Sequence, residues 1–397
     1  SILLVPGVNT IGEGSAGFNV RGGSADQNLI LLYGAPLYNS NHFFGFFSAV
    51  NPDIIRDVTL YKGGIPGRFG GRLSSVLEIV PREGNRREFA GNAGISPVTA
   101  HFSVEGPIKK DTLFYLLTGR TTYSDWILRA VENTQLNNSS ASFNDLNARI
   151  AWDPGRKNKI DLSAYYSHDA FRLNSDTSYK YMNSIVSARW RHYFTSMFFS
   201  SLTVNNSYYK YNISSVRVPE EAFSLIHSIN STGLKAEFNL FKGRSEFNFG
   251  SELTRYNVVP GNYRPADDSS LVLPNSIQNQ RAIEGSVWLE DKYTLTDYLS
   301  LNAGLRFSTF FALGPQTVFI YNPESSRSLS SVMDTVSFKR SGIYRKYSGP
   351  EIRLSANFRL GDYSSLKLNY NHTRQYLHQL SNTTSIAPTD IWKLSDY

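Results

Sequence analysis

The fold is decided by the stretch from Val20-Arg21-Gly22-Gly23 to Val76-Leu77-Glu78-Ile79, in which glycines separate short apolar segments. Leu29-Ile30-Leu31-Leu32 is an uninterrupted apolar run, which predicts a strand buried on both faces. The residues from Asp57 to Tyr61 alternate, and those from Ser74 to Val80 form a third strand-like segment. The stretch therefore predicts a small α/β domain with tight turns.

Two further signals inside this stretch mark a helix start and a turn. Asn51-Pro52-Asp53 predicts a helix start, with Asn as the N-cap and Pro at the first helical position. The run from Gly63 to Gly71 predicts a tight loop dominated by its backbone. It lacks the Gly-Lys-Ser/Thr ending of a phosphate-binding loop, so a turn that packs strands together is favoured.

The order of the segments VRGG, LILLYGAPLYN, NPDIIRDVTLYKGG and GRFGGRLSSVLEIV resembles the plug domain of TonB-dependent outer-membrane receptors. The resemblance is strongest to the Bacteroidetes-type group, which shares the sequence motifs LYKGG and YGGRLSSVL. Tyr33 departs from the pattern, because an acidic residue is usual there. Upstream plug segments and a TonB box do not appear in the sequence. We therefore expect a plug domain over residues 1–84 that lacks its N-terminal part.

After about Phe89, the chain shows repeated alternation of apolar and polar residues, which predicts strands with one apolar and one polar face. Six segments show this alternation, with an apolar residue at every second position from the first residue to the last. They are Leu146–Trp152, Ile160–Tyr166, Leu234–Leu240, Leu299–Phe307, Ile352–Phe358 and Leu366–Tyr370.

Three features favour a membrane barrel over a soluble β-sandwich. The strands are long, aromatic residues cluster near strand ends, as in Tyr208-Tyr209-Lys210-Tyr211, and the connections alternate between short and long. The expected short connections are Ile108–Thr112, Asp153–Asn158, Phe194–Met197, Phe241–Ser245, Thr294–Tyr298 and Gly361–Tyr363. The expected long ones are Ala130–Ser142, Leu173–Met182, Ser214–Ala222, Asn257–Gln280 and Phe311–Tyr347.

The segments Gly106-Pro107-Ile108, Leu113-Phe114-Tyr115 and Gly119–Tyr123 also resemble the start of the barrel in this receptor family. We expect about 12–13 strands by Asn371, whereas the family's barrels have about 22 strands and closed barrels have no open edge. The predicted fold is therefore mainly β: a transmembrane antiparallel β-barrel over residues 85–397, incomplete here, with the α/β plug inside its lumen. The tail Gln375–Tyr397 is expected to be another outer loop, with Pro388-Thr389-Asp390 turning into a short helix.

Composition agrees with this interpretation. Hydrophobic residues make up 41% and aromatic residues 14% of the 397 residues, there is no Cys, and no apolar run reaches the ~18 residues of a membrane helix. The formal net charge is +7, but Lys and Arg are scattered singly, which disfavours nucleic-acid binding. A positive lumen could attract anionic ligands.

The sequence shows no enzyme signature. The seven His residues have no metal-ligand spacing, Gly12–Gly17 does not place Ser at the centre of a nucleophile elbow, and no cofactor is predicted. The acidic pairs Asp267-Asp268 and Glu220-Glu221 lie in expected loops and are interpreted as solvated, although calcium binding at the first pair stays open.

The resemblance implies a ligand site made by apical plug loops and inward barrel residues. Carried onto this chain, it predicts Arg21 in the VRGG turn and the loop Tyr38–Phe44, with substrate-binding candidates Tyr38, Asn39, Asn41, His42 and Phe43. The alternative is that the loop's aromatic residues only pack the plug against the wall. The loop Phe311–Tyr347 is a candidate lid.

The implied function is TonB-dependent import of a scarce substrate across the bacterial outer membrane, with the plug gating the barrel. The implied partners are a TonB-type periplasmic energy-transducing protein, outer-membrane lipids and a small-molecule or oligomeric substrate. The first alternative is a receptor-like barrel that serves as a structural subunit of a larger outer-membrane complex, whose partners would be a surface lipoprotein or other subunits of that complex. The second is a soluble β-rich surface protein. Iron chelates, vitamins, oligosaccharides and peptides all remain open as substrates.

Overall fold

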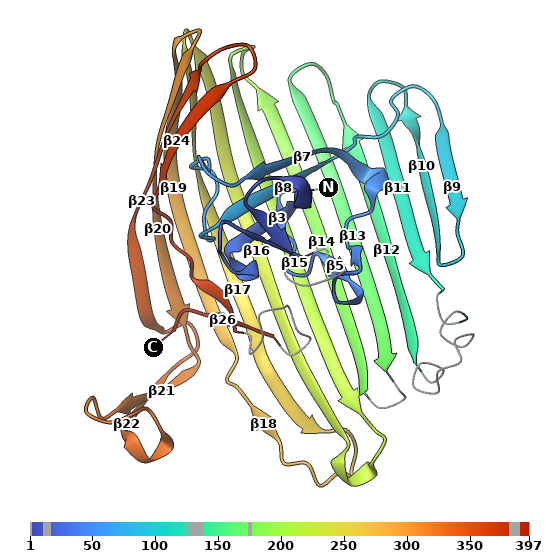
Figure 1. Ribbon diagram of the computed structural model, residues 1–397, viewed down its shortest axis with the longest axis vertical. Helices are drawn as coiled ribbons and strands as arrows, with labels where there is room; N and C mark the ends of the chain where they lie inside the picture. The colour runs from blue at the N-terminus through green and yellow to red at the C-terminus, as the bar shows by residue number, and fades with distance from the viewer. Residues whose placement is uncertain are drawn as a thin grey trace.

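A large curved antiparallel sheet carries a small domain on its concave side in the computed structural model (Figure 1). The structure describes residues 2–10, 17–123, 126, 139–173, 177–380 and 390–396. No helix in these ranges is long and apolar enough to cross a membrane. The predicted loop Ala130–Ser142 lies mostly outside the described residues, as do most of the Gly12–Gly17 segment and Pro388-Thr389.

The small domain is built on a four-stranded sheet in the order β4-β3-β8-β7. Strand β3 (Asn28–Leu32) runs parallel to β8 (Ser75–Pro81), and β7 (Ile55–Tyr61) pairs antiparallel with the other edge of β8. The three predicted strands are therefore confirmed. The apolar run ends in Leu32, which is fully buried together with Val20 and Ile54. Their burial gives this domain, called the plug below, a core of its own.

The predicted helix start is confirmed as a single 3-10 turn, η4 (Pro52–Ile54). The side chain of Asn51 accepts a hydrogen bond of 2.9 Å from the backbone nitrogen of Asp53, as expected of an N-cap. The remaining plug elements are short: η1 (Ile2–Leu4), β1 (Val8–Thr10), β2 (Phe18–Val20), η2 (Ala25–Gln27), β4 (Ala35–Pro36), β5 (Asn41–His42), η3 (Phe43–Gly45) and β6 (Phe47–Ser48).

The large sheet has 14 strands among the described residues, and all but the short β18 (Asn275–Ser276) follow one another in a single path from β9 to β24. The path comprises β9 (Ala90–Ile95), β10 (Thr99–Lys109), β11 (Leu113–Thr122), β12 (Ser140–Trp152), β13 (Asn158–Leu173), β14 (Thr177–Tyr193), β15 (Phe198–Ser215), β16 (Phe223–Lys242), β17 (Ser245–Pro265), β19 (Gln280–Thr296), β20 (Leu299–Leu313), β23 (Ile343–Arg359) and β24 (Ser365–Asn371).

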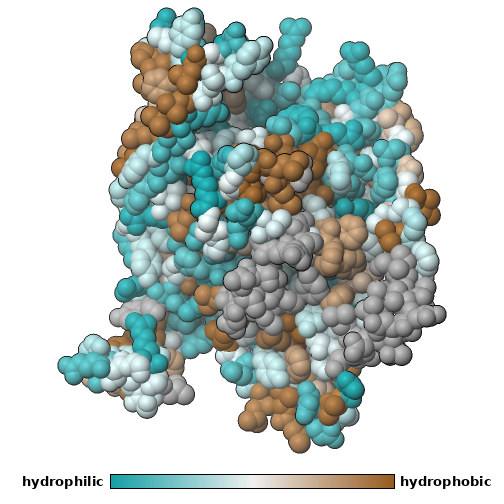
Figure 2. Space-filling model, in the orientation of Figure 1, coloured by the Kyte–Doolittle hydropathy of each residue, from teal (hydrophilic) through white to brown (hydrophobic). Residues whose placement is uncertain are grey.

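Alternation along these strands separates the two faces of the sheet. Leu162 is 50% exposed and Val186 is 56% exposed on the convex face, whereas Ser163 and Ser187, each one residue further along, are buried beneath the plug. The convex face therefore carries an apolar band, and teal hydrophilic side chains cover much of the concave side in Figure 2. This is the arrangement of a membrane barrel wall, whose outer face contacts lipid. The predicted fold class is confirmed.

All six predicted short connections are present on one edge of the wall, called the short-turn rim, which lies at the top of Figure 1. The opposite edge is called the long-loop rim. The predicted long loop Leu173–Met182 is wrong, because β14 begins at Thr177 and its polar and aromatic residues continue the strand. The predicted loop Asn257–Gln280 is likewise shorter, since β17 extends to Pro265. Ser214–Ala222 is confirmed as a connection and contains η5 (Pro219–Glu221).

The candidate lid Phe311–Tyr347 is not an irregular loop. It contains a hairpin of β21 (Gln316–Tyr321) and β22 (Val332–Phe338), joined through η6 (Leu329–Ser331). This hairpin projects away from the plug at the lower left of Figure 1, so it does not cover the lumen.

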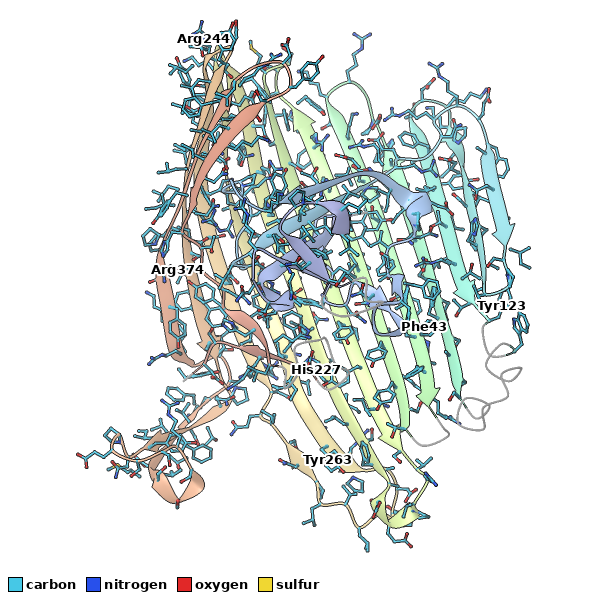
Figure 3. All side chains as sticks on the ribbon, in the orientation of Figure 1. Phe43, Tyr123, His227, Arg244, Tyr263 and Arg374 are labelled. Atoms are coloured by element: carbon cyan, nitrogen blue, oxygen red, sulfur yellow. The ribbon has the colours of Figure 1, made fainter. Side chains whose placement is uncertain are left out.

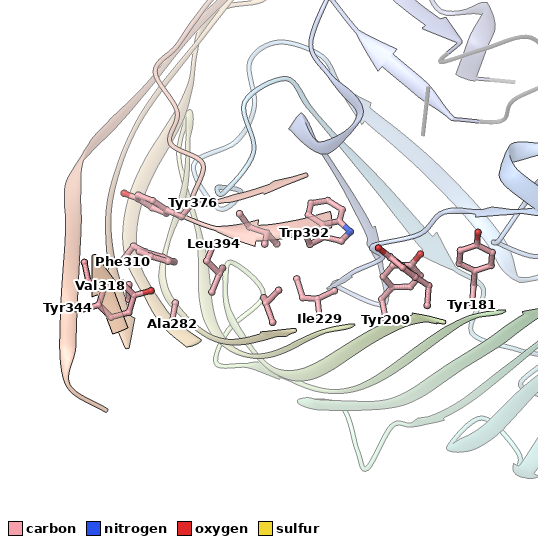
Figure 4. Packing of buried hydrophobic residues seen from close by; sticks show 14 of the residues in the cluster. Tyr181, Tyr209, Ile229, Ala282, Phe310, Val318, Tyr344, Tyr376, Trp392 and Leu394 are labelled. Atoms are coloured by element: carbon pink, nitrogen blue, oxygen red, sulfur yellow. The ribbon is translucent and has the colours of Figure 1, made fainter. Parts of the chain in front are cut away.

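The described part of the tail Gln375–Tyr397 forms a hairpin on the concave side instead of the predicted outer loop. After His372 the chain turns onto the concave side and forms a hairpin of β25 (Leu377–Leu380) and β26 (Ile391–Leu394). The expected short helix after Asp390 is wrong, because Ile391–Leu394 is a strand whose Trp392 and Leu394 are buried among wall residues (Figure 4). We call this element the tail hairpin.

Candidate functional site

A cavity of about 90 Å³ lies where a plug loop, the wall and the tail hairpin meet. Four of the six predicted site residues line it: Tyr38, Asn39, Asn41 and Phe43. The wall and the tail supply the other side, through Tyr181, Tyr209, Tyr211, Gln379, Asp390 and Trp392. Figure 3 places Phe43 on the same side of the plug as His227 and Tyr263, toward the long-loop rim. We call this space the aromatic cavity.

The plug side of the cavity is shaped by the segment that follows β4. The backbone nitrogen of Asn41 donates to the side-chain oxygen of Asn39 at 3.2 Å, which folds the loop back on itself. The Tyr38 ring meets the Trp392 ring edge-on, with 5.7 Å between the ring centroids. Burial raises the pKa of Tyr38 to about 12, so its hydroxyl keeps its proton and can act as a donor at neutral pH.

Three wall tyrosines face this loop. Tyr181 comes from β14, and Tyr209 and Tyr211 come from alternate positions of β15, so both point into the lumen (Figure 4 labels Tyr181 and Tyr209). The Tyr211 ring stacks on His227 of β16 at 5.0 Å. Sequence reasoning missed Tyr209 and Tyr211, because their run of aromatics was interpreted as a membrane-boundary cluster. Alternation along the strand could have identified them. Leu202 and Val204 face outward at even-numbered positions, so Tyr209 and Tyr211 at odd-numbered positions face the lumen.

Several buried polar atoms around the cavity have no hydrogen-bond partner among the described residues. They include the hydroxyls of Tyr38 and Tyr211 and both ring nitrogens of His227. Buried polar groups are nearly always paired in folded proteins, by protein, water or ligand. The walls of the cavity therefore present apolar ring faces together with free donors and acceptors.

The tail hairpin is held to the plug beside the cavity. The backbone nitrogen of Gln379 donates to a carboxylate oxygen of Asp26 at 3.2 Å, and the Gln375 amide donates to the same oxygen at 3.0 Å. The Arg72 guanidinium lies over the Trp392 ring at 5.4 Å and donates to the Leu377 carbonyl at 3.3 Å. These contacts keep the hairpin against the cavity.

His42, one of the predicted substrate-binding candidates, does not line the aromatic cavity. Its side chain is fully buried, with Nδ1 at 2.8 Å from Asp169 and Nε2 at 3.5 Å from Asp145, and its ring stacks on Phe143 at 4.1 Å. Burial alone would lower the pKa of His42, but the interactions with the carboxylates of Asp145 and Asp169 outweigh burial and raise it. Arg120 completes the group by binding Asp145 at 2.7 Å.

Arg21 also lies away from the aromatic cavity. Its backbone adopts a left-handed conformation, with φ of 50°, and its side chain is exposed. The guanidinium lies against Gly63, where an added Cβ would come within 3.0 Å of it. Arg21 therefore packs two plug turns together in this structure.

Wall side chains hold the plug mainly through its backbone. Tyr165 donates to the Ala49 carbonyl at 2.9 Å, Ser187 to the Tyr33 carbonyl at 2.9 Å, and Ser207 to the Pro36 carbonyl at 2.6 Å. Further bonds of this kind run from Arg120 to Ser48, Arg149 to Pro81 and Arg82, Asn205 to Gly34, Lys235 to Arg68, Arg306 to Gly67, and Arg353 to Phe69.

The glycine-rich loop from Gly63 to Gly71 is one of the segments held in this way. The backbone nitrogen of Gly67 donates to Glu290, and an added Cβ at Gly70 would lie only 2.5 Å from Nε of Arg306. The close approach of wall side chains explains why this loop is rich in glycine. No group of three or more His, Cys, Asp or Glu side chains that could hold a metal ion occurs among the described residues.

Comparison with known proteins gives one family match. Residues 2–75 match the model of the TonB-dependent Receptor Plug Domain. No curated protein matches.

Solved structures share the fold over most of the chain. A copper transporter aligns with 94% of this chain at 13% identity and a TM-score of 0.70. The ferric preacinetobactin receptor of Acinetobacter baumannii aligns with 95% of the chain at 14% identity and a TM-score of 0.63. The ferric yersiniabactin uptake receptor of Yersinia pestis aligns with 97% at 12% identity and a TM-score of 0.64. The chain covers 61% of the first two structures and 63% of the third.

Proposed function

We propose that the chain forms the plug and part of the barrel of an outer-membrane receptor that imports a scarce substrate, with a TonB-type periplasmic protein drawing on the plug. The plug domain match over residues 2–75 and the barrel fold support this proposal. We place the boundary between plug and barrel at residues 84 and 85. In this proposal the chain is a transporter and not an enzyme. The short-turn rim faces the periplasm, and the long-loop rim faces outward.

The aromatic cavity carries the proposal, because it lies on the outward side of the plug and holds unpaired polar atoms between ring faces. Rings pack against apolar ligand faces, while tyrosine hydroxyls and Asn39 and Asn41 amides donate and accept hydrogen bonds. We therefore propose an organic substrate with apolar faces and several hydrogen-bonding groups. Two of the compared structures are receptors for ferric preacinetobactin and ferric yersiniabactin, and a ferric chelate is a candidate for the organic substrate proposed here.

The cavity in this structure is too small for such a substrate. Its volume of about 90 Å³ is well below the roughly 300–1,000 Å³ of pockets that bury drug-sized ligands. The tail hairpin fills the adjoining space with Trp392 and Leu394. Substrate binding therefore requires the tail hairpin to move away from Tyr38 and Tyr211, or the wall to widen.

An uptake experiment tests this function. Cells that express the receptor are compared with a deletion strain on a panel of limiting iron chelates, vitamins, glycans and peptides. Import that requires both the receptor and the TonB-type partner is the expected result. Tyr211→Ala should reduce that import at least tenfold, whereas Tyr208→Ala, a tyrosine on the other face of the same strand, should preserve it.

Three outcomes would contradict the proposal or its assignment to the aromatic cavity. Import that continues without the energy-transducing partner would exclude the receptor mechanism. Absence of import, together with a protein that co-purifies in fixed ratio, would favour the alternative of a structural subunit in an outer-membrane complex. Equal loss in both tyrosine variants would remove the aromatic cavity from the substrate path.

A further inference from the structure

A second cavity, of about 100 Å³, lies between the plug and the wall near the short-turn rim. Its plug side is formed by β7, β8 and Tyr33, and its wall side by β12, β13 and β14. The charged side chains that line it are Arg56, Glu78, Glu83, Arg149, Lys159, Asp161, Arg189 and Arg191. Five are cationic and three are carboxylates, so this space has an excess of positive charge.

The register of the wall strands concentrates the cations. Lys159 of β13 lies directly opposite Arg191 of β14, and Asp161 lies directly opposite Arg189. Residues two apart along a strand share a face, so Lys159, Arg189 and Arg191 project from the same patch of the lumen wall. Like charges directly opposite each other in a sheet are destabilising unless something neutralises them.

The three carboxylates are already engaged by other cations. Asp161 accepts a hydrogen bond from Nε of Arg149 at 3.1 Å. Glu83 binds Arg86 at 2.6 Å, and Glu78 lies 3.5 Å from Arg68. None of these carboxylates approaches Lys159, Arg189 or Arg191 within ion-pair distance among the described residues.

The two arginines make only neutral contacts. Nε of Arg189 donates to the Thr203 hydroxyl at 3.3 Å, and Nη1 of Arg191 lies 3.5 Å from the Tyr193 hydroxyl. Nε of Arg191 is buried and has no hydrogen-bond partner among the described residues. No carboxylate therefore pairs with either guanidinium group within ion-pair distance among the described residues, and both arginines line the cavity.

We propose that Lys159, Arg189 and Arg191 form a binding site for an oxyanion, such as a phosphate or carboxylate group, between the plug and the wall near the short-turn rim. Guanidinium groups bind such groups through paired hydrogen bonds, and a lysine adds a compact charge. The cavity has room for one group of this size. The site is separate from the aromatic cavity, and binding to it is measurable without import, so it does not rest on the proposed function.

Equilibrium dialysis of the detergent-solubilised receptor against labelled inorganic phosphate tests the site. We expect saturable binding that weakens with added salt, and at least a tenfold rise in Kd in the double variant Arg189→Gln/Arg191→Gln. The matched control is Arg156→Gln/Lys157→Gln, which removes two exposed charges from the turn that precedes β13. This control should bind phosphate like the wild type.

Thermal unfolding gives a second readout that does not depend on the dialysis. Phosphate should raise the apparent Tm of the wild type and of the control, but not that of the double variant, because only a ligand that binds the folded state stabilises it. The double variant should fold without phosphate, since its substitutions remove repulsion. Absence of saturable binding by the wild type, or equal loss in both double variants, would overturn the proposal.

Competition then identifies the source of the anion. Displacement of labelled phosphate by short-chain phosphatidylglycerol at lower concentration than by unlabelled phosphate would assign the site to a lipid headgroup. Displacement by succinate at the lowest concentration would assign it to a carboxylate, and preference for unlabelled phosphate to the free ion.

Discussion

His42 shows how a single plug residue can tie the plug to the wall. It is surrounded by Asp145 of β12 and Asp169 of β13, and Arg120 of β11 reaches the first of these. Because the folded protein raises the pKa of His42, the protonated form stabilises docking. This contribution is complete below the unfolded value of about 6.5 and is lost as the pH rises through the higher folded value.

We therefore predict that plug docking weakens as the pH rises above neutrality. His42→Ala should weaken docking by about 3 kcal/mol or more at low pH, where two buried carboxylates lose a charged partner, and by less at high pH, where His42 is neutral. Protease sensitivity of the plug, measured from pH 5 to 9, checks both statements. His168→Ala is the matched control, because His168 lies on the opposite face of β13 from Asp169. A flat pH profile in the wild type would contradict the assignment.

Gly84 and Gly155 separate two reasons why a position requires glycine: a left-handed backbone and a lack of space for a side chain. Their φ angles are +94° and +93°, so an alanine is strained at both positions. An added Cβ at Gly84 would also lie 2.6 Å from the Tyr115 carbonyl oxygen, whereas at Gly155 nothing lies within 4 Å. Gly84 is thus limited by contact as well as by conformation.

Gly84→Ala should consequently lower the free energy of unfolding by more than Gly155→Ala, which should cost only about 1–2 kcal/mol for the left-handed backbone. Urea-dependent unfolding of the two variants in the same detergent measures the difference. Equal effects would mean that the segment joining plug to wall adjusts away from β11.

At the scale of single residues, the sequence singled out the plug loop that lines the cavity. It did not distinguish the residues that line the cavity from His42, which binds the wall. Tyr38, Asn39, Asn41 and Phe43 line the cavity, and their role in substrate binding stays a prediction. His42 could not be placed, because its partners Asp145 and Asp169 lie more than a hundred residues away along the chain. The sequence around His42 does not show which wall residues will lie beside it in the folded chain.

At the scale of elements, alternation predicted the wall strands well because one side faces lipid and the other the plug. It failed where both faces carry polar and aromatic residues, as at the start of β14, which we interpreted as a loop. It also failed for the tail hairpin, since four-residue strands such as Ile391–Leu394 are too short to show a period.

The tail hairpin is predicted to depend on Trp392, which is buried between Tyr38 and Arg72. Trp392→Ala should detach the hairpin and increase proteolysis within residues 375–397, because removing a buried tryptophan costs about 3–5 kcal/mol. Leu380→Ala, at an exposed position of the same hairpin, is the control. Equal cleavage in both variants would show that the contacts of Asp26 hold the hairpin without the indole.

At the scale of the molecule, the sheet has two open edges, since β9 and β24 do not pair with each other among the described residues. Unpaired backbone groups are costly in lipid, so membrane barrels close. We predict that native mass spectrometry of the particle extracted from its membrane gives a mass well above 44.6 kDa, from additional strands. A detergent-independent species of 44.6 kDa would exclude the membrane barrel.

The hydrogen bonds from wall side chains to plug carbonyl oxygens have a consequence for how the two parts diverge. A carbonyl is the same in every residue, so mutations at plug positions such as Tyr33, Pro36 or Ala49 leave the acceptor in place. Substitutions of the donors Tyr165, Ser187 or Ser207 remove the bond itself. At these positions the plug side chain can therefore change without loss of the bond, whereas the wall's donors must be inherited as a set.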